Sequence, residues 1–335
     1  ENNFRYYSQY FEEVRVFAYG QFNEWVLPRV KVLPNRFRLP RYLYAFIIPI
    51  IHKSEISNAA VLRGMQLTGG IPACLAKFLY RIPVVVNYGY DYVKVALVEG
   101  KVIRAWLLKV LTLLLLPCSD KVIITNQELA RQLIGVPKNK IHLIPNGIDT
   151  VVFRPQRMRK LFDIIYVGRF EVQKNLKLLL TAAAKVKPYP KILLIGSGSL
   201  KNNLLNLADA LKLNLTIYDS VSHKNLPYYL NQSRMFVLPS LIEGNPKALL
   251  EAMSCGLPVI GTGVEGIKDI ITDSLNGLIA ESTAKKLAYA IKKLSSNIFL
   301  QKSLGEQARK TILRQYNAKM IWEKELTILT LLARN

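Results

Sequence analysis

Cysteine, histidine and acidic residues are all scarce in this chain of 335 residues. Its three cysteines, Cys74, Cys118 and Cys255, are far apart, and it has only three histidines. None of these residues shows the close spacing that zinc ligands usually have. The sequence therefore argues against a disulfide-stapled fold and a dedicated zinc site, and the few cysteines suit a reducing compartment.

Long hydrophobic runs are also missing. No apolar run reaches the ~20 residues that a membrane-spanning helix needs. The opening segment ENNFRYYSQY is polar, so we expect no signal peptide there. The two most apolar stretches, 42–51 and 105–117, are interrupted by Pro49 and Lys109. Each is a candidate for a helix that lies on a membrane, and each equally fits a buried core helix.

The shortage of acids leaves a strong positive charge. Lysine and arginine number 46 against 23 Asp and Glu, which splits as 19 against 10 through Thr150 and 27 against 13 after it. Such an excess attracts nucleic acid, anionic lipid or phosphorylated ligands, although it is also compatible with a role in solubility alone.

Half of the residues are hydrophobic, and short apolar runs alternate with helical patterns along the chain. Asn126 is the expected N-cap of a helix over 127–135. The alternation predicts an α/β fold with doubly wound parallel sheets, divided near residues 146–160. We expect strands at 12–20, 82–89, 119–126, 140–149, 162–168, 191–196, 215–221, 235–239 and 258–261. In the second half we expect helices at 175–187, 200–211, 225–232, 247–255 and 267–273.

Two loops at expected strand ends contain residues suited to a phosphorylated ligand. GRFEVQKN (168–175) places Arg169 and Lys174 after Gly168, and two such cations suit a diphosphate. GSGS (196–199) contains Gly196 and Gly198, which permit close approach of a ligand to the backbone. Each loop taken alone is equally typical of a solvated turn.

The stretch PSLIEGNPKALLEAMSCG (239–256) places two glutamates around an expected helix start. Asn245 is predicted as the N-cap and Pro246 as the first helical residue. The free amides of Lys247 and Ala248 would then favour an anion. Glu243 and Glu251, eight residues apart, would suit neutral hydroxyls such as those of a ribose better than the phosphates themselves.

These segments together resemble the GT-B glycosyltransferases of family 4, which retain anomeric configuration. The matching segments are IPNGIDTVVFRP, GRFEVQKN, LIGSGS, NGLI and the stretch from Pro239 to Ile271, with LAKFLYRIPVVVNYGYDY and CSDKVIITNQELARQL in the first half. The resemblance implies a GT-B fold, in which two Rossmann-like domains face a central cleft. It implies an acceptor-binding domain over 1–155, a donor-binding domain over 156–312 and a C-terminal helix over 313–335 that crosses the junction.

The resemblance also assigns roles to the candidate residues. Glu243, Arg169 and Lys174 would be catalytic, with the two cations on the donor diphosphate and Glu243 at the transferred sugar. Glu251 would bind the ribose. The remaining donor-binding candidates are Gly168, Gly196, Gly198, Ser222, Gly244, Asn245, Pro246, Lys247 and Ala248. His223, near the expected nucleobase position, is better interpreted as a solvent-facing loop residue.

The resemblance implies a reaction without metal or cofactor. The sequence has no Asp-x-Asp pair, the motif by which GT-A enzymes hold a metal, so the two cations and the helix start would stabilise the leaving diphosphate. Retention would follow from attack of the acceptor on the same face of the sugar, with no protein nucleophile. The expected donor is a UDP-sugar or a GDP-sugar, although the sequence itself does not choose between UDP-, GDP- and ADP-sugars.

The sequence departs from the family pattern in two places. The expected first strand and its glycine-rich loop do not precede 12–20, so the first domain is expected to lack that element or to be incomplete. The family's His-Gly pair is replaced by Tyr88 and Gly89. Tyr88, Gly89 and Asp91 are therefore the candidates on the acceptor side, with Tyr88 equally interpretable as a packing residue.

Basic residues beside apolar stretches suggest where the acceptor is found. Five cations and no acid fill 29–41, directly before 42–51. We therefore expect a glycan or lipid-linked acceptor of cell-envelope or polysaccharide biosynthesis, and a cytoplasmic enzyme that docks peripherally on anionic membrane. The alternatives are a sugar-nucleotide epimerase, a glycan phosphorylase or, from charge alone, a nucleic-acid-binding protein.

Overall fold

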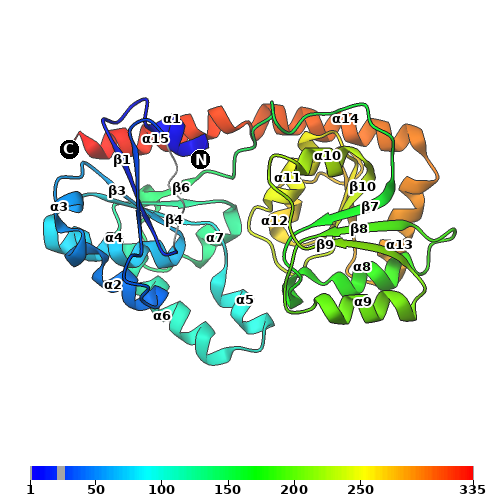
Figure 1. The fold of residues 1–335 in the computed structure, drawn as a ribbon, viewed down its shortest axis with the longest axis horizontal. Helices are drawn as coiled ribbons and strands as arrows, with labels where there is room; N and C mark the ends of the chain where they lie inside the picture. Colours follow the sequence, from blue (N-terminus) through cyan, green and yellow to red (C-terminus); the bar gives the residue numbers. More distant parts are fainter. Residues whose placement is uncertain (1, 21–26, 335) are drawn as a thin grey trace. The chain divides into compact units, whose positions relative to one another are not determined.

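The computed structural model describes residues 2–20 and 27–334 (Figure 1). The chain forms two compact units, which are described one at a time. The first comprises Glu1–Tyr90, Trp106–Pro145 and Met320–Asn335, and the second comprises Asp91–Ala105 and Asn146–Lys319. The sequence predicts that the whole of 1–155 belongs to the first domain, whereas residues 91–105 and 146–155 belong to the second unit.

The first unit is built on a four-stranded parallel sheet of order β3-β4-β5-β6, beside a two-stranded parallel sheet of β1 and β2. Its strands are β1 (Val14–Ala18), β2 (Val30–Pro34), β3 (Leu62–Met65), β4 (Val84–Tyr88), β5 (Lys121–Ile124) and β6 (Ile141–Leu143). Its helices are α1 (Asn2–Tyr7), α2 (Arg41–Ile51), α3 (Lys53–Ile56), α4 (Gln66–Tyr80) and α7 (Gln127–Gln132), with the 3-10 turn η1 (Lys138–Lys140) and most of α6 (Val102–Cys118) and α15 (Ala318–Ala333).

Successive side chains of β4 point to opposite faces of this sheet, and each face is covered. Val85 packs in a buried cluster with Ile321 and Ile328 of α15. On the other face a Cβ at Gly70 of α4 would lie 3.4 Å from Val86 Cγ1, so that helix sits close to the strand. The sheet thus lies between α15 and the helices on the side of α4 (Figure 1).

The C-terminal segment differs from the single helix expected over 313–335. Two helices are found there: α14 (Ile298–Gln315) ends at Gln315, and α15 begins at Ala318. The break is fixed by backbone pairing, because Ile148 N donates to Tyr316 O and Ala318 N donates to Ile148 O. Within the first unit, α15 is held by an ion pair of 2.8 Å between Glu325 Oε1 and Arg63 Nη2.

The second unit is a six-stranded parallel sheet of order β12-β11-β10-β7-β8-β9. Its first strand, β7, lies in the middle, and the chain moves outward through β8 and β9 before it returns to β10 on the other side of β7. The strands are β7 (Phe162–Val167), β8 (Lys191–Ile195), β9 (Asn214–Tyr218), β10 (Ser233–Leu238), β11 (Val259–Thr262) and β12 (Leu278–Ala280). The helices are α5 (Tyr92–Val98), α8 (Leu176–Ala183), α9 (Lys201–Ala210), α10 (Leu226–Asn231), α11 (Lys247–Ser254), α12 (Glu265–Lys268), α13 (Ala284–Ser295) and α14, with the 3-10 turn η2 (Val172–Lys174).

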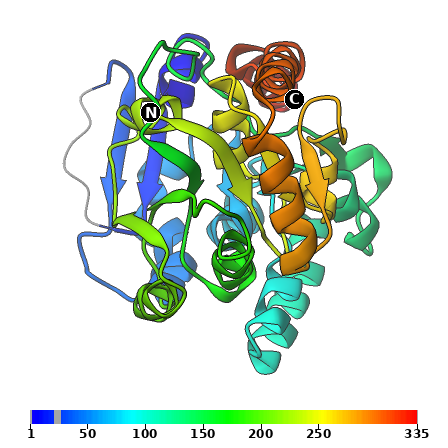
Figure 2. The same ribbon diagram turned by 90° about the vertical axis from the view of Figure 1, so that its right-hand side faces the viewer.

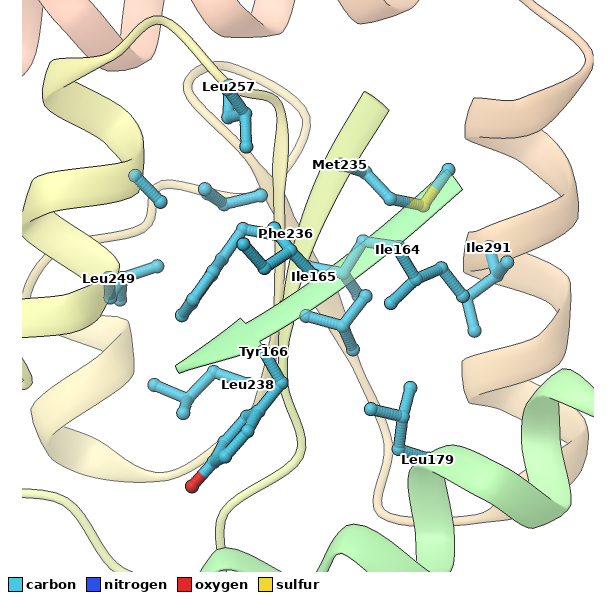
Figure 3. Packing of buried hydrophobic residues seen from close by; sticks show 14 of the residues in the cluster. Ile164, Ile165, Tyr166, Leu179, Met235, Phe236, Leu238, Leu249, Leu257 and Ile291 are labelled. Atoms are coloured by element: carbon cyan, nitrogen blue, oxygen red, sulfur yellow. The ribbon is translucent and has the colours of Figure 1, made fainter. Parts of the chain in front are cut away.

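Helices cover both faces of this sheet (Figures 1 and 2). Around the central strands, Ile165 and Phe236 point toward Leu249 of α11, whereas Ile164 and Met235 lie on the side of α8 and α13 (Figure 3). All five residues are fully buried. Such continuous apolar runs are typical of strands that are buried on both faces, which explains why the sequence predicted them.

Several local predictions are confirmed and others are wrong. Asn126 does cap α7, because its Oδ1 accepts from Leu129 N at 2.9 Å. The helix expected over 267–273 is instead the short α12 from Glu265 to Lys268, and Ile270 and Ile271 are buried beyond its end. Strands β2, β3 and β12 were not predicted. In the part of the chain that the structure describes, none of the helices meets the length and hydropathy that a bilayer-spanning helix requires.

Candidate active site

The strand order of the second unit creates a switch point between β7 and β10. After β7 the chain continues to β8 on one side, and after β10 it continues to β11 on the other side. In open parallel sheets, ligands bind at such a point, beyond the carboxyl ends of the strands. The loop after β7 contains Gly168–Lys174, and the loop after β10 leads to α11. A backbone hydrogen bond of 2.8 Å from Leu241 N to Gln173 O joins the two loops.

Lys174 and Glu243 meet at this switch point. The Lys174 Nζ lies 2.6 Å from Glu243 Oε1, and the two side chains are 14% and 4% exposed. The same carboxylate oxygen accepts from Ser240 Oγ at 2.6 Å. Sequence reasoning had separated these two residues into different roles and had missed Ser240, although it stands only three positions before Glu243.

Ser240 is itself held from the neighbouring strand. Thr262, the last residue of β11, donates its hydroxyl to Ser240 O at 2.5 Å. A buried charge is stable only when it is paired and hydrogen-bonded. The pair of Lys174 and Glu243 is therefore fixed by contacts from the ends of three adjacent strands.

Helix α11 begins one residue later than the sequence predicted. Pro246 occupies the N-cap position, where it makes no side-chain capping bond, and Lys247 is the first helical residue. Asn245 was wrongly predicted as the cap because its side chain is used elsewhere: Asn245 Oδ1 accepts from Asn146 N at 2.8 Å, and its carbonyl accepts from Asn146 Nδ2 at 2.7 Å. The first N–H groups of α11 have no partner within the helix, as at every helix start.

Glu251 lies in the second turn of α11, with only 6% of its side chain exposed. Its Oε1 is 2.8 Å from His223 Nε2. The His223 side chain is 68% exposed and packs against the Phe153 ring, with ring centroids 5.0 Å apart. The expected solvent-facing histidine is thus exposed, but it also contacts the carboxylate that was predicted to bind a ribose. Ser222, also exposed, accepts from Asn225 N through its carbonyl.

The loop after β7 is anchored to the loop after β8. Ser199 donates from its N and its Oγ to the Glu171 carboxylate, at 3.2 and 2.8 Å. These bonds, the hydroxyl bond above all, lower the pKa of Glu171. Gly196 makes the approach possible, because its φ is +145° and a Cβ there would lie 1.9 Å from Gly168 O. A Cβ at Gly198 would likewise meet Phe170 O, at 2.5 Å.

Arg169 is exposed, and its carbonyl accepts from the buried Tyr166 hydroxyl at 2.9 Å. Among the interactions of the described residues, none joins the Arg169 guanidinium to Lys174 or Glu251. The structure thus brings Lys174 together with Glu243 and His223 together with Glu251. Arg169 is on the same loop as Lys174; among the described residues it forms no ion pair, and its positive charge acts on the Glu171 carboxylate.

The three acceptor-side candidates have structural roles. Tyr88 is buried at the end of β4. The carbonyl of Gly89 accepts from Thr125 Oγ1 at 2.9 Å, and a Cβ there would lie 2.9 Å from Thr125 Cγ2. In the second unit, Asp91 caps α5 by accepting from Lys94 N at 2.8 Å. Within the described ranges, no three His, Cys, Asp or Glu residues come together as a metal site would require.

Gly266 is a further residue of the site that sequence reasoning missed. A Cβ there would lie 2.2 Å from Gly244 O and 2.4 Å from Glu243 O. The α12 backbone is therefore in close contact with the loop that positions Glu243. We expect Gly266→Ala to displace this loop and to lower the free energy of unfolding by about 1–3 kcal/mol. Thermal unfolding measures the loss.

The matched control for that substitution is Gly263→Ala. A Cβ at Gly263 would meet only side-chain atoms, at 3.6 Å, so this variant should unfold close to the wild-type temperature. Equal unfolding temperatures for the two variants would show that Gly266 does not constrain the loop.

Two family models match consecutive parts of the chain. The model described as Glycosyl transferases group 1 matches residues 149–311, and the model described as Glycosyltransferase Family 4 matches residues 8–152. Together they span both units, and the model described as Glycosyl transferases group 1 contains Lys174, Glu243 and Glu251.

Similar proteins carry related names. An uncharacterized glycosyltransferase of Methanocaldococcus jannaschii is 30% identical over 210 residues, which are 62% of this chain and 57% of that protein. The UDP-Gal:alpha-D-GlcNAc-diphosphoundecaprenol alpha-1,3-galactosyltransferase of Escherichia coli is 29% identical over 236 residues, which are 63% of this chain and 60% of that enzyme. The chain thus spans less than two thirds of the length of these relatives.

A solved structure matches the fold. Sucrose-phosphate synthase from Thermosynechococcus elongatus superimposes with a TM-score of 0.84 over 96% of this chain and 89% of that one, at 20% identity. At this identity the match concerns the fold alone. It confirms the predicted GT-B class.

Proposed function

Because the chain belongs to glycosyltransferase family 4, we propose that it transfers a sugar from a nucleoside-diphosphate sugar to a glycan or lipid-linked acceptor. The observation that supports this most strongly is the buried contact of Lys174 with Glu243 at the β7–β10 switch point. We assign donor binding to the second unit, which contains this contact, and acceptor binding to the first.

Lys174 would bind the donor diphosphate. Its ammonium has three N–H donors, and the contact with Glu243 uses one of them. The others are then available to phosphate oxygens, while Glu243 fixes the direction of the side chain. Arg169, exposed on the same loop, would supply a second, bidentate contact.

The start of α11 would complete the phosphate site. Its first N–H groups lack helical partners, and the helix dipole favours an anion there. Gly244, Asn245 and Pro246 would shape the turn that leads to the amides of Lys247 and Ala248. The bonds between Asn245 and Asn146 hold this turn before any ligand arrives.

The two glutamates would bind the neutral parts of the donor. Glu251, one turn into α11, would accept from the ribose hydroxyls. It offers Oε2 directly, whereas Oε1 is shared with His223. Glu243 would face the transferred sugar through its Oε2, because its Oε1 already accepts from Lys174 and Ser240.

The proposed reaction proceeds on one face of the sugar. The bond between the anomeric carbon and the β-phosphate oxygen breaks, and its electron pair stays on the nucleoside diphosphate. The acceptor hydroxyl oxygen bonds to the anomeric carbon from the same side, and its proton passes to the departing phosphate oxygen. Lys174, Arg169 and the α11 amides stabilise the charge that develops on that phosphate. The anomeric configuration is therefore retained without a protein nucleophile.

The E. coli relative guides the choice of substrates. Its name specifies UDP-Gal as donor and a diphosphoundecaprenol-linked acceptor. We therefore propose a UDP-sugar donor, with a GDP-sugar as the second choice, and an acceptor of cell-envelope or polysaccharide biosynthesis. Nucleotide sugars and the free thiols of Cys74, Cys118 and Cys255 suit a cytoplasmic enzyme.

Thermal-shift measurements with UDP, GDP and ADP test the proposal. A nucleotide present at a hundred times its Kd should add about 2.7 kcal/mol of stability, and we expect UDP to raise the Tm most. Incubation with UDP-sugars then separates the alternatives, because an epimerase would convert the donor without acceptor and a phosphorylase would need inorganic phosphate. If none of the three nucleotides changed the Tm, the proposal would fail.

Metal removal gives a second expected result. In the proposed mechanism the leaving diphosphate is stabilised by side chains and helix amides, so EDTA should change the transfer rate by no more than about twofold. The check is UDP release with EDTA and with added MgCl2 or MnCl2. Loss of activity in EDTA that a divalent ion restores would contradict this mechanism.

A further inference from the structure

Helix α2 is apolar around its whole circumference but is only half covered. Tyr44 and Ile48 face the protein and are buried. On the opposite side, four large apolar residues are 51–66% exposed: Tyr42, Leu43, Phe46 and Ile50. A helix that is hydrophobic all round is normally buried or in contact with lipid. We therefore expect another molecule or a lipid surface to cover the outer side of α2.

Two neighbouring helices, α4 and α6, lie on the same side of the four-stranded sheet as α2 (Figure 1), and they also carry exposed apolar residues. Helix α4 contacts α2 through the bond from Tyr80 to Pro49 O, and it contacts α6 through the bond from Cys74 to Leu115 O. Further exposed residues at the carboxyl end of α4 and along α6 are Phe78, Leu79, Trp106, Leu107, Leu113 and Leu114. The α6 residues recur seven positions apart and therefore share one side of that helix.

We call these ten side chains of α2, α4 and α6 the apolar face. Monomeric soluble proteins rarely expose so many large apolar side chains on neighbouring helices unless something binds to them. All ten residues belong to the first unit.

The segments that form the apolar face contain cations and no acids. Residues 29–54, 56–90 and 100–119 include no Asp or Glu. Exposed cations flank the face in sequence, and none of them forms an ion pair among the described residues: Arg36, Arg38, Lys53, Arg81 and Lys109. Exposed apolar side chains on segments that contain cations and no acids match the interface of an anionic bilayer, where rings and aliphatic groups enter the headgroup region and the cations meet lipid phosphates.

We propose that the apolar face docks the chain peripherally on an anionic lipid bilayer. A second copy of the chain is a poorer occupant, because a symmetric contact would bring the same cations together. The inference rests on the proposed function and deepens it, since this surface would bring the enzyme to the membrane in which a lipid-linked acceptor resides.

Vesicle sedimentation tests the proposal with the full chain. Wild type should sediment with phosphatidylglycerol vesicles at low salt and much less with phosphatidylcholine vesicles. Added salt should weaken but not abolish binding, because it screens only the charge contribution. The double variant Phe46→Glu/Ile50→Glu, which places acids in the apolar face, should lower the partition coefficient at least about tenfold.

The control places the same charge on a different exposed surface. Ile298 and Phe299 begin α14 in the second unit and are 60% and 84% exposed. Ile298→Glu/Phe299→Glu should sediment like wild type, and circular dichroism should show that both double variants are folded. Wild-type protein that stays in the supernatant with phosphatidylglycerol, or a Phe46/Ile50 variant that sediments fully, would overturn the proposal. So would dimerisation through this face without vesicle binding.

Tryptophan fluorescence gives a second readout. In the variant Trp25→Phe/Trp322→Phe, Trp106 is the remaining tryptophan, and it is 62% exposed. Its emission should shift to the blue with phosphatidylglycerol vesicles and be quenched by brominated lipid. Failure of docking is distinguishable from failure of the proposed function, because UDP binding is measured without vesicles and should be the same in wild type and the Phe46/Ile50 variant.

Discussion

Lys174→Ala is expected to lower kcat/KM for the donor by about 10²- to 10³-fold, the usual cost of removing one group that stabilises developing charge. The Lys174 ammonium lies 2.6 Å from Glu243 Oε1, in the loop where the leaving phosphate is proposed to bind. Its loss removes a cation from that position and leaves a buried carboxylate unpaired. Release of UDP from a UDP-sugar, measured over a range of donor concentrations, gives the ratio.

The unpaired carboxylate requires its own control, because breaking a buried ion pair also destabilises the fold. Lys174→Met/Glu243→Gln removes both charges and should restore the Tm toward wild type without restoring the rate. Lys177→Ala, an exposed position at the start of α8, should have no effect on either. A Lys174→Ala enzyme that is folded and within threefold of the wild-type rate would rule out this lysine as the phosphate ligand.

Glu251→Ala and Glu243→Gln are expected to affect different constants. Hydrogen bonds to charged groups contribute about 1.5–3 kcal/mol, so loss of the proposed ribose contact should weaken UDP binding by about 10- to 150-fold. Glu243→Gln should leave the UDP Kd closer to wild type and should mainly lower kcat, because UDP lacks the sugar that Glu243 would face. Calorimetric titration with UDP and steady-state kinetics separate the two effects.

His223 provides the sharper control for Glu251. Its ring contacts the Glu251 carboxylate but is largely exposed, so His223→Ala tests whether the carboxylate acts directly or only by holding this ring. We expect His223→Ala to keep the UDP Kd within about threefold of wild type, since the carboxylate remains available to the ribose. A loss as large as that of Glu251→Ala would assign the contact to His223, and an unchanged Kd in Glu251→Ala would remove the ribose assignment altogether.

The sequence predicted the second unit better than the first for a physical reason. Strands β7, β8 and β10 are buried on both faces, so their apolar runs are unmistakable. The short strands β2, β3 and β12 have only three to five residues and give little periodicity to detect. Strand β2 moreover lies within the basic segment 29–41, where the many cations interrupt the apolar pattern that would indicate a strand.

The sequence predicted which residues form the candidate site, but it did not predict which of their side chains contact one another. Local spacing indicated Lys174, Glu243 and Glu251, yet the contact between Lys174 and Glu243 joins positions 69 apart and the contact between His223 and Glu251 joins positions 28 apart. The error at Asn245 has the same origin, because its partner Asn146 is 99 residues away. Capping preferences describe neighbours in sequence, and a tertiary partner overrides them.

A crystal structure of the chain with UDP tests the proposed donor site most directly. We expect the diphosphate to lie against Lys174 and the first amides of α11, with the ribose hydroxyls on Glu251. A nucleotide bound with Lys174 still facing only Glu243 and with its ribose away from Glu251 would contradict it.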